Sequence, residues 1–154
     1  MKPVRAELNL RDEREFSLVD YGTSHAWAVF RGMPVRDDDV PFGSAAKVLD
    51  VVFLGLERIA SWRHVKSLHV RMADQAQKAA LEERIGRIRR SDSVYFIEEG
   101  SLEHYVIASR VYWAEYDLTY DADSPLVADS GVDGRASGGA TPPLGPIRYA
   151  DWEQ

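Results

Sequence analysis

The sequence predicts an α+β fold, in which a predominantly antiparallel β-sheet of about six strands, sandwich-like or curled, carries one main amphipathic helix. Three observations support this prediction. Several short segments alternate apolar and polar residues with the period of two that a strand requires, and turn-forming residues join two pairs of them into hairpins. A single long segment, residues 74–90, has helical periodicity instead. These patterns do not determine the strand order.

Length and composition fit one soluble globular domain. The chain has 154 residues, of which 45% are apolar and 29% charged, and it contains no cysteine. A domain of this size buries roughly 70% of the surface that its unfolded chain exposes, so it needs no disulfide or structural metal. The first residues lack the apolar core of a signal peptide, and no apolar run approaches the ~18 residues of a membrane span. We therefore expect a cytoplasmic protein that does not bind membranes.

The first half of the chain predicts four strands, with a loop between the second and the third. Residues 15–20 and 25–31 read as a hairpin around the turn 21–24, and the stretch 32–43 has the prolines, glycines and aspartates of a loop. Residues 45–60 fit a buried strand or a helix, and the consecutive β-formers at 51–53 favour the strand. Residues 66–72 alternate cleanly, which predicts a strand with one exposed face.

The second half predicts the helix and a second hairpin. Asp74 and Gln77 have the spacing of a capping box at the start of the helix over 74–90. The expected apolar stripe of this helix consists of Ala76, Ala80, Leu81, Ile85 and Ile88. Residues 93–98 and 104–120 form the hairpin, and the return strand is long enough to predict a bulge or break near residues 109–110.

The C-terminal segment differs in composition. Residues 121–147 contain five of the eleven glycines and four of the seven prolines, and residues 117–154 hold two basic against seven acidic side chains. We predict a globular domain over 1–120 and an acidic, Gly/Pro-rich tail over 121–154, in which Tyr149 and Trp152 are candidates for docking on the domain.

The remaining chemistry of the chain argues against most classes of site. A net charge of −6 is unfavourable for nucleic-acid binding, which depends on Lys and Arg at phosphates. Without cysteine the chain has no thiolate nucleophile and no cysteine-ligated metal. It also lacks the Gly-x-Ser-x-Gly elbow and any phosphate-binding glycine loop. We predict no cofactor, and keep His25, His69 and His104 as an alternative metal or ligand set.

Aromatic residues are the most informative feature of the predicted strands. Most of them belong in the core of a domain of this size, but a patch on the last long strand would form an interface, because Trp and Tyr dominate binding hot spots. The candidate partner-binding residues are Tyr112, Trp113, Tyr116 and Tyr120 with Arg110 at their rim, together with the acids Asp37, Asp38 and Asp39.

From these features we expect a noncatalytic module that binds another protein, of a bacterial immunity (toxin-neutralising) type or a defence-system adaptor. Acidic side chains would steer such a protein onto a basic partner. Two alternatives remain. In the first, a small-ligand-binding protein or metal-dependent enzyme has a pocket at the mouth of the β-sandwich, where His25, His69, His104 and Arg110 converge. In the second, the chain is a structural subunit that self-associates through a sheet edge.

Overall fold

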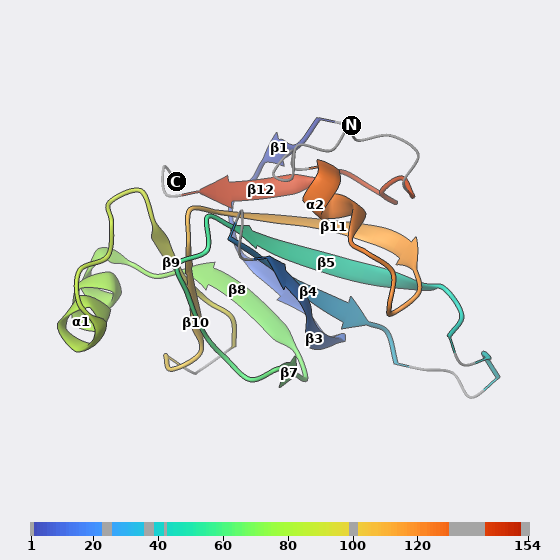
Figure 1. Cartoon of the computed structure of the whole chain (residues 1–154), viewed down its shortest axis with the longest axis horizontal. Helices are drawn as coiled ribbons and strands as arrows, with labels where there is room; N and C mark the ends of the chain where they lie inside the picture. Colours follow the sequence, from blue (N-terminus) through green and yellow to red (C-terminus); the bar gives the residue numbers. More distant parts are fainter. Residues whose placement is uncertain are drawn as a thin grey trace.

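The computed structural model describes residues 2–22, 26–35, 39–41, 43–98, 102–129 and 141–151, and its strands form two sheets (Figure 1). The mainly antiparallel pairing and the one main helix confirm the predicted α+β class. Within the described ranges there are twelve strands where the sequence predicts about six. Four of the twelve are only two or three residues long, which is too short for alternation to reveal them.

The larger sheet has seven strands. Their spatial order is β1 (Val4–Arg5), β12 (Arg148–Asp151), β11 (Arg110–Leu118), β5 (Ala46–Leu54), β4 (Trp27–Met33), β3 (Glu15–Gly22) and β7 (His64–Val65). β3 and β4 form the predicted first hairpin, whose turn residues 23–25 lie outside the described residues. β5 confirms the strand interpretation of residues 45–60, and it pairs with β11 along its whole length.

The smaller sheet has five strands. Their order is β2 (Leu10–Asp12), β8 (Leu68–Met72), β9 (Ser93–Phe96), β10 (Tyr105–Ala108) and β6 (Arg58–Ala60). The predicted long return strand is broken at Ser109, where the chain leaves the small sheet as β10 and enters the large one as β11. The chain crosses between the sheets at the same corner after β5, at Gly55, whose φ of 62° is left-handed. A Cβ atom at Gly55 would lie 1.8 Å from the Ser109 hydroxyl oxygen, so the corner requires glycine.

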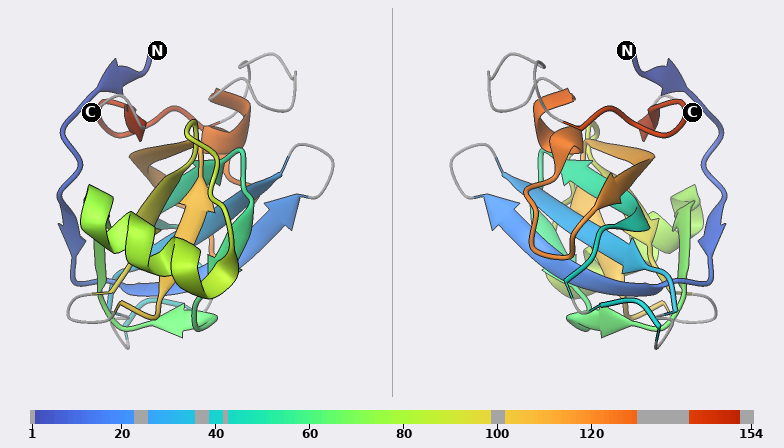
Figure 2. Two further views of the ribbon diagram at one scale, coloured as in Figure 1. Left: turned by 90° about the vertical axis from the view of Figure 1, so that its left-hand side faces the viewer. Right: turned by 90° about the vertical axis from the view of Figure 1, so that its right-hand side faces the viewer.

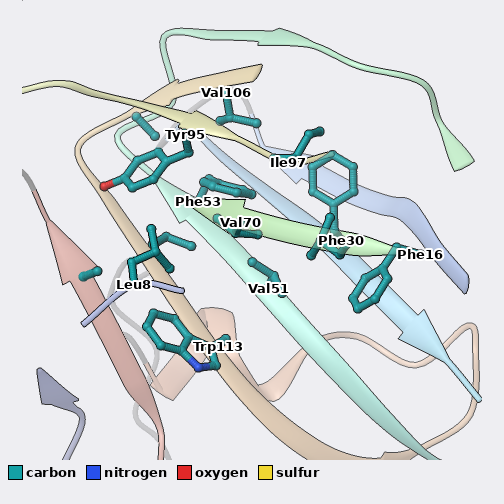
Figure 3. Packing of buried hydrophobic residues seen from close by; sticks show 14 of the residues in the cluster. Leu8, Phe16, Phe30, Val51, Phe53, Val70, Tyr95, Ile97, Val106 and Trp113 are labelled. Atoms are coloured by element: carbon teal, nitrogen blue, oxygen red, sulfur yellow. The ribbon is translucent and has the colours of Figure 1, made fainter. Parts of the chain in front are cut away.

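The main core lies between the two sheets (Figure 3). Phe30 and Phe53 from the large sheet meet edge to face, with ring centroids 6.0 Å apart, and Tyr95 from the small sheet packs on Phe53 at 5.5 Å. The inward side chains of β8 complete the small-sheet surface of this core. Such burial of apolar area is the dominant favourable term in folding.

Each sheet is also covered on its outer face (Figure 2). Helix α1 (Gln75–Ile85) lies across the small sheet, and its Leu81 packs with residues of β9 and β10. Short helix α2 (Pro125–Asp129) packs with β11 and β5 on the large sheet, and Leu126 and Ile147 are buried there. Because both faces of the large sheet are covered, its central strands are buried on both sides.

Helix α1 is shorter than predicted. Asp74 and Gln77 form the predicted capping box, but the helix ends before Gly86, whose φ of 98° no longer continues the turn. Ala76 and Ala80 of the expected apolar stripe are exposed, while Ile88 is buried from the segment that follows the helix. The packing surface of α1 is therefore narrower than the sequence pattern indicates.

Several of the described residues after 120 are packed into the domain. β12 lies inside the large sheet between β1 and β11, and α2 and Ile147 form part of a buried cluster. The predicted boundary at residue 120 thus separates two parts of one core. Composition suggested a tail because the segment has few large apolar residues, yet those few are the ones that cover the sheet.

Candidate functional site

The aromatic patch predicted on the last long strand is not exposed. Tyr112, Trp113 and Tyr116 have exposed fractions of 6%, 6% and 0%, so the prediction that they form an interface is wrong. Trp113 points into the core between the sheets, whereas Tyr112 and Tyr116 lie beneath the layer formed by α2 and Ile147. Tyr120, which follows the end of β11, is the exposed member of the set at 47%.

Arg110 and Tyr149 lie together at the start of β11. The Tyr149 ring stacks on Tyr112 with centroids 5.3 Å apart, and the Arg110 guanidinium lies 6.0 Å from the Tyr149 ring centroid. The pKa of Arg110 is raised, chiefly by its side-chain hydrogen bond to Tyr112. Tyr149 therefore packs against β11 as a member of β12. Trp152, the other docking candidate, lies outside the described residues.

The described candidate histidines lie apart from the pockets of the molecule. His69 is buried in β8, where its Nε2 is 3.0 Å from the Asn9 amide oxygen, so the exposed face predicted for this strand is wrong at that position. His104 stacks on Trp62 at 5.8 Å, and its Nδ1 is 3.8 Å from a Glu98 carboxylate oxygen. Neither histidine, nor Arg110, lines either of the two surface pockets described below. His25, Asp37 and Asp38 lie outside the described residues, and Asp39 is exposed.

A buried ion pair that sequence reasoning missed organises the outer side of the large sheet. Arg31 of β4 and Asp50 of β5 are directly opposite in the strand register, and both side chains are completely buried. Arg31 Nε donates to Asp50 Oδ1 at 2.7 Å and Arg31 Nη2 donates to Oδ2 at 2.9 Å. This is the bidentate geometry in which arginine binds a carboxylate most strongly.

The third nitrogen of Arg31 holds the chain segment that follows β11. Nη1 donates to the backbone carbonyl oxygens of Thr119, Tyr120 and Ala122 at 3.2, 2.9 and 2.6 Å. Ser124 is tied to the same centre, because its hydroxyl donates to Asp50 Oδ2 at 2.6 Å. The segment 119–124 is thus anchored to a charge in the core and has a fixed backbone.

A pocket of about 370 Å³ lies between this anchored segment and strand β3. Its wall on β3 is a bulge, where the pairing register with β4 shifts between Leu18 and Asp20. Three carboxylates line it against one cation, Arg63, and the exposed Tyr120 stands at its side. The lining residues are Leu18, Val19, Asp20, Arg63, Tyr120, Asp121, Ala122, Asp123 and Ser124. We refer to this site as the acidic pocket.

Ser124 is the one hydroxyl-bearing aliphatic side chain that lines the acidic pocket, and its hydrogen bonds are already made within the protein. The Ser124 hydroxyl is committed as a donor to Asp50, and it accepts from the backbone nitrogen of Leu126 at 3.3 Å. Both carboxylate oxygens of Asp50 are engaged by Arg31, so the carboxylate hydrogen-bonded to the serine is not an unengaged base. Asp121 is oriented by the Thr119 hydroxyl, which donates to it at 2.9 Å.

No family model, curated protein or solved structure matches this chain. Among the described residues, no three His, Asp or Glu side chains are grouped so that they could hold a metal ion. Neither helix in the described ranges has the length and apolar character needed to cross a bilayer.

Proposed function

We propose that this chain is a noncatalytic protein-binding module that accepts a basic side chain of its partner in the acidic pocket. The observation that carries the proposal is the pocket of about 370 Å³ in which Asp20, Asp121 and Asp123 face a single cation. An Arg or Lys side chain inserted there would bring a positive charge next to three neighbouring carboxylates and reduce their mutual repulsion, which favours binding.

Preorganisation supports the proposal. Ordering a loop on binding costs free energy, and a site whose loop is already fixed avoids that cost. Three hydrogen bonds from the buried Arg31 hold the backbone of residues 119–122 in place before any partner arrives. A buried charged pair is an expensive way to stabilise a core, so its use here fits a role in shaping the surface above it.

The surroundings of the acidic pocket favour a protein over a small metabolite. Sites for small molecules are lined mainly by apolar and aromatic side chains. Four of the residues lining this pocket are ionisable acids or bases, and the exposed Tyr120 beside them is of a type enriched in protein interfaces. Within this class we retain a toxin-neutralising immunity protein or a defence-system adaptor, because acidic residues would steer the module onto a basic partner surface.

The test compares three forms of the purified protein as bait in a lysate of its native host. These are the wild type, Asp121→Asn/Asp123→Asn, and the matched control Asp117→Asn, which neutralises an exposed acid on β11 outside the pocket. We expect the wild type and the control to retain the same stoichiometric partner. The double variant should bind the purified partner at least about tenfold more weakly.

Two results would overturn the proposal. One is a partner that all three forms bind with equal affinity, since that partner does not use the pocket. The other is a partner whose binding surface is acidic, since such a surface would be repelled by the three carboxylates. Circular dichroism and unfolding midpoints of the variants confirm that all three forms are folded.

A further inference from the structure

A second pocket, of about 270 Å³, lies beside the C-terminal end of α1 on the small sheet. It is formed where the segment after the helix meets β6 and β10. Its lining residues are Glu57, Arg58, Ile85, Gly86, Arg87, Ile88, Arg89, Asp92 and Ile107. None of them belongs to the acidic pocket, and we refer to this site as the arginine pocket.

Both acids of the arginine pocket are paired with the same arginine. Arg89 Nε donates to Asp92 Oδ2 at 3.0 Å, and Arg89 Nη2 donates to Glu57. The hydrogen bond to Asp92 is the main cause of the raised pKa of Arg89. One arginine therefore pairs with both carboxylates of the pocket.

Two further arginines remain with unused positive charge. Arg58 and Arg87 line the pocket, both are exposed, and the side chain of neither makes a hydrogen bond or an ion pair with another residue in the described part of the chain. The C-terminal end of α1 contributes an opposing charge equivalent to roughly −0.5. The lining holds three arginines against two carboxylates, a formal charge of +1 that exceeds the charge of the helix end, so the pocket favours an anion.

The apolar part of the pocket is aliphatic. Ile85, Ile88 and Ile107 line it; Ile85 is partly exposed, whereas Ile88 and Ile107, with exposed fractions of 7% and 4%, pack mainly in the cluster beneath α1 and present little surface to the pocket. A phosphate has no apolar part to place against isoleucine side chains. A carboxylate joined to an aliphatic group matches both halves of the pocket, since guanidinium binds carboxylate bidentately and the isoleucines bury the hydrocarbon.

The frame around the arginine pocket is held by specific hydrogen bonds. Lys78 Nζ donates to the Asp92 carbonyl oxygen at 2.7 Å, and the Ile88 backbone nitrogen donates to a Glu82 carboxylate oxygen at 3.0 Å. The Gly86 nitrogen closes the end of the helix by donating to the Glu82 carbonyl oxygen at 2.9 Å. These contacts fix the segment that carries Arg87 and Ile88.

We propose that the arginine pocket binds the carboxylate of an aliphatic acyl-amino acid, the chemistry presented by the C-terminal residue of a peptide that ends in leucine, isoleucine or valine. Arg58 and Arg87 bind the carboxylate, and the three isoleucines contact the aliphatic side chain. The volume of about 270 Å³ suits one such residue. The site is independent of the acidic pocket, which attracts the opposite charge.

The test uses NMR of the full chain with isotope-labelled isoleucine methyl groups, titrated with N-acetyl-leucine. The chain carries its own controls, because Ile97 and Ile147 are buried in other clusters. We expect saturable shifts at Ile85, Ile88 and Ile107 only. N-acetyl-leucinamide, which lacks the charge, should bind at least about tenfold more weakly. Acetyl-Ala-Ala-Leu, with a free carboxylate, should bind at least as tightly as N-acetyl-leucine if the source is a chain end, and more weakly if it is a free small acid.

Two variants test whether binding depends on the arginines of the pocket or only on positive charge nearby. Arg58→Gln/Arg87→Gln should lower the affinity at least about tenfold, whereas Arg90→Gln, an exposed neighbour that does not line the pocket, should change it less than twofold. The proposal is overturned if acid and amide bind equally, if the double variant binds as the wild type does, or if inorganic phosphate shifts these methyl groups and N-acetyl-leucine does not. Unchanged methyl signals of Ile97 and Ile147 would show that each variant is folded.

Discussion

Arg31 and Asp50 face each other across β4 and β5 with both side chains completely excluded from solvent, and Arg31 also binds three backbone carbonyl groups of the segment after β11. The pair thus links two neighbouring strands to the loop that forms the acidic pocket. A buried ion pair adds little stability compared with apolar residues, but removing one partner leaves an uncompensated charge. The stability of the protein therefore depends on keeping both members together.

Replacing Asp50 by alanine should lower the free energy of unfolding by about 3–5 kcal/mol, because Arg31 would remain buried without its counter-ion. Urea unfolding followed by tryptophan fluorescence measures the change. Lys47→Ala is the matched control on the same strand, since its side chain is 64% exposed and its ion pair with Glu115 is long at 3.7 Å. The control should change stability by less than about 0.5 kcal/mol. Equal losses in the two variants would show that the pair does not have the proposed role.

Tyr112 and Tyr120 lie at either end of the predicted aromatic patch, and we expect opposite behaviour from their alanine variants. Tyr112→Ala creates a cavity beneath Tyr149 and should cost about 3–5 kcal/mol of stability. Tyr120→Ala removes an exposed ring and should change stability by less than about 0.5 kcal/mol while weakening partner binding. Unfolding curves and the partner titration measure both effects. A Tyr112→Ala protein that is stable but no longer binds its partner would support the original prediction that Tyr112 belongs to an exposed binding patch.

Burial in the core raises the pKa of Tyr95 above the ordinary value of 10.0, because the phenolate would be desolvated there. The unfolded chain therefore releases this proton at lower pH than the folded one. The contribution of Tyr95 to stability is fully present below about pH 10 and is lost as the pH rises further. Between about pH 8 and about pH 10.5, the urea unfolding midpoint of the wild type should fall more than that of Tyr95→Phe.

At neutral pH the same variant gives a second result. The Tyr95 hydroxyl is buried with no partner in good hydrogen-bond geometry among the described residues, and the nearby Ser93 side chain offsets only part of the rise in its pKa, so Tyr95→Phe should be at least as stable as the wild type. A Tyr95→Phe protein that is less stable by more than about 1 kcal/mol would reveal a partner for the hydroxyl. If the midpoint falls equally for both proteins at high pH, the loss of stability at alkaline pH comes from groups other than Tyr95.

The capping box of α1 gives a further prediction. The Asp74 side chain accepts from the Gln77 nitrogen at 2.8 Å, and the Gln77 side chain accepts from the Asp74 nitrogen at 3.0 Å. Asp74→Ala removes this cap and should cost about 1 kcal/mol. Glu83→Ala, at an exposed site inside the same helix, is the control and should cost less than half as much. Thermal or urea unfolding of the wild type and both variants measures the two losses of stability.

Local patterns predicted the elements that local chemistry determines. The first hairpin, the strand over 46–54, the capping box and the break near residue 109 all follow from turn residues, β-formers and spacing within a few residues. The extent of α1 was overestimated because Ile88 continues the apolar spacing after Gly86 has ended the helix. A pattern of side chains does not show where the backbone changes direction.

The candidate site depended on contacts between distant segments. Tyr112 and Tyr116 are buried because α2 and Ile147, from a stretch poor in large apolar residues, cover their face of the sheet. Arg31 gave no signal, since arginine is rarely buried and its partner Asp50 lies on another strand. The acidic pocket joins a bulge in β3 to the loop after β11, which only the folded topology brings together.

The first strand of the chain lies beside the last. β1 pairs in parallel with β12, with Val4 opposite Arg148, and β12 is what separates β1 from β11. During synthesis on a ribosome, β1 emerges before the other described strands but has no sheet neighbour until β12 has been made. Until then the edge of β11 is open, and open edges pair readily with other chains. A nascent chain thus keeps this edge exposed until β12 has emerged and paired, and protease sensitivity of stalled chains of increasing length would trace when that edge closes.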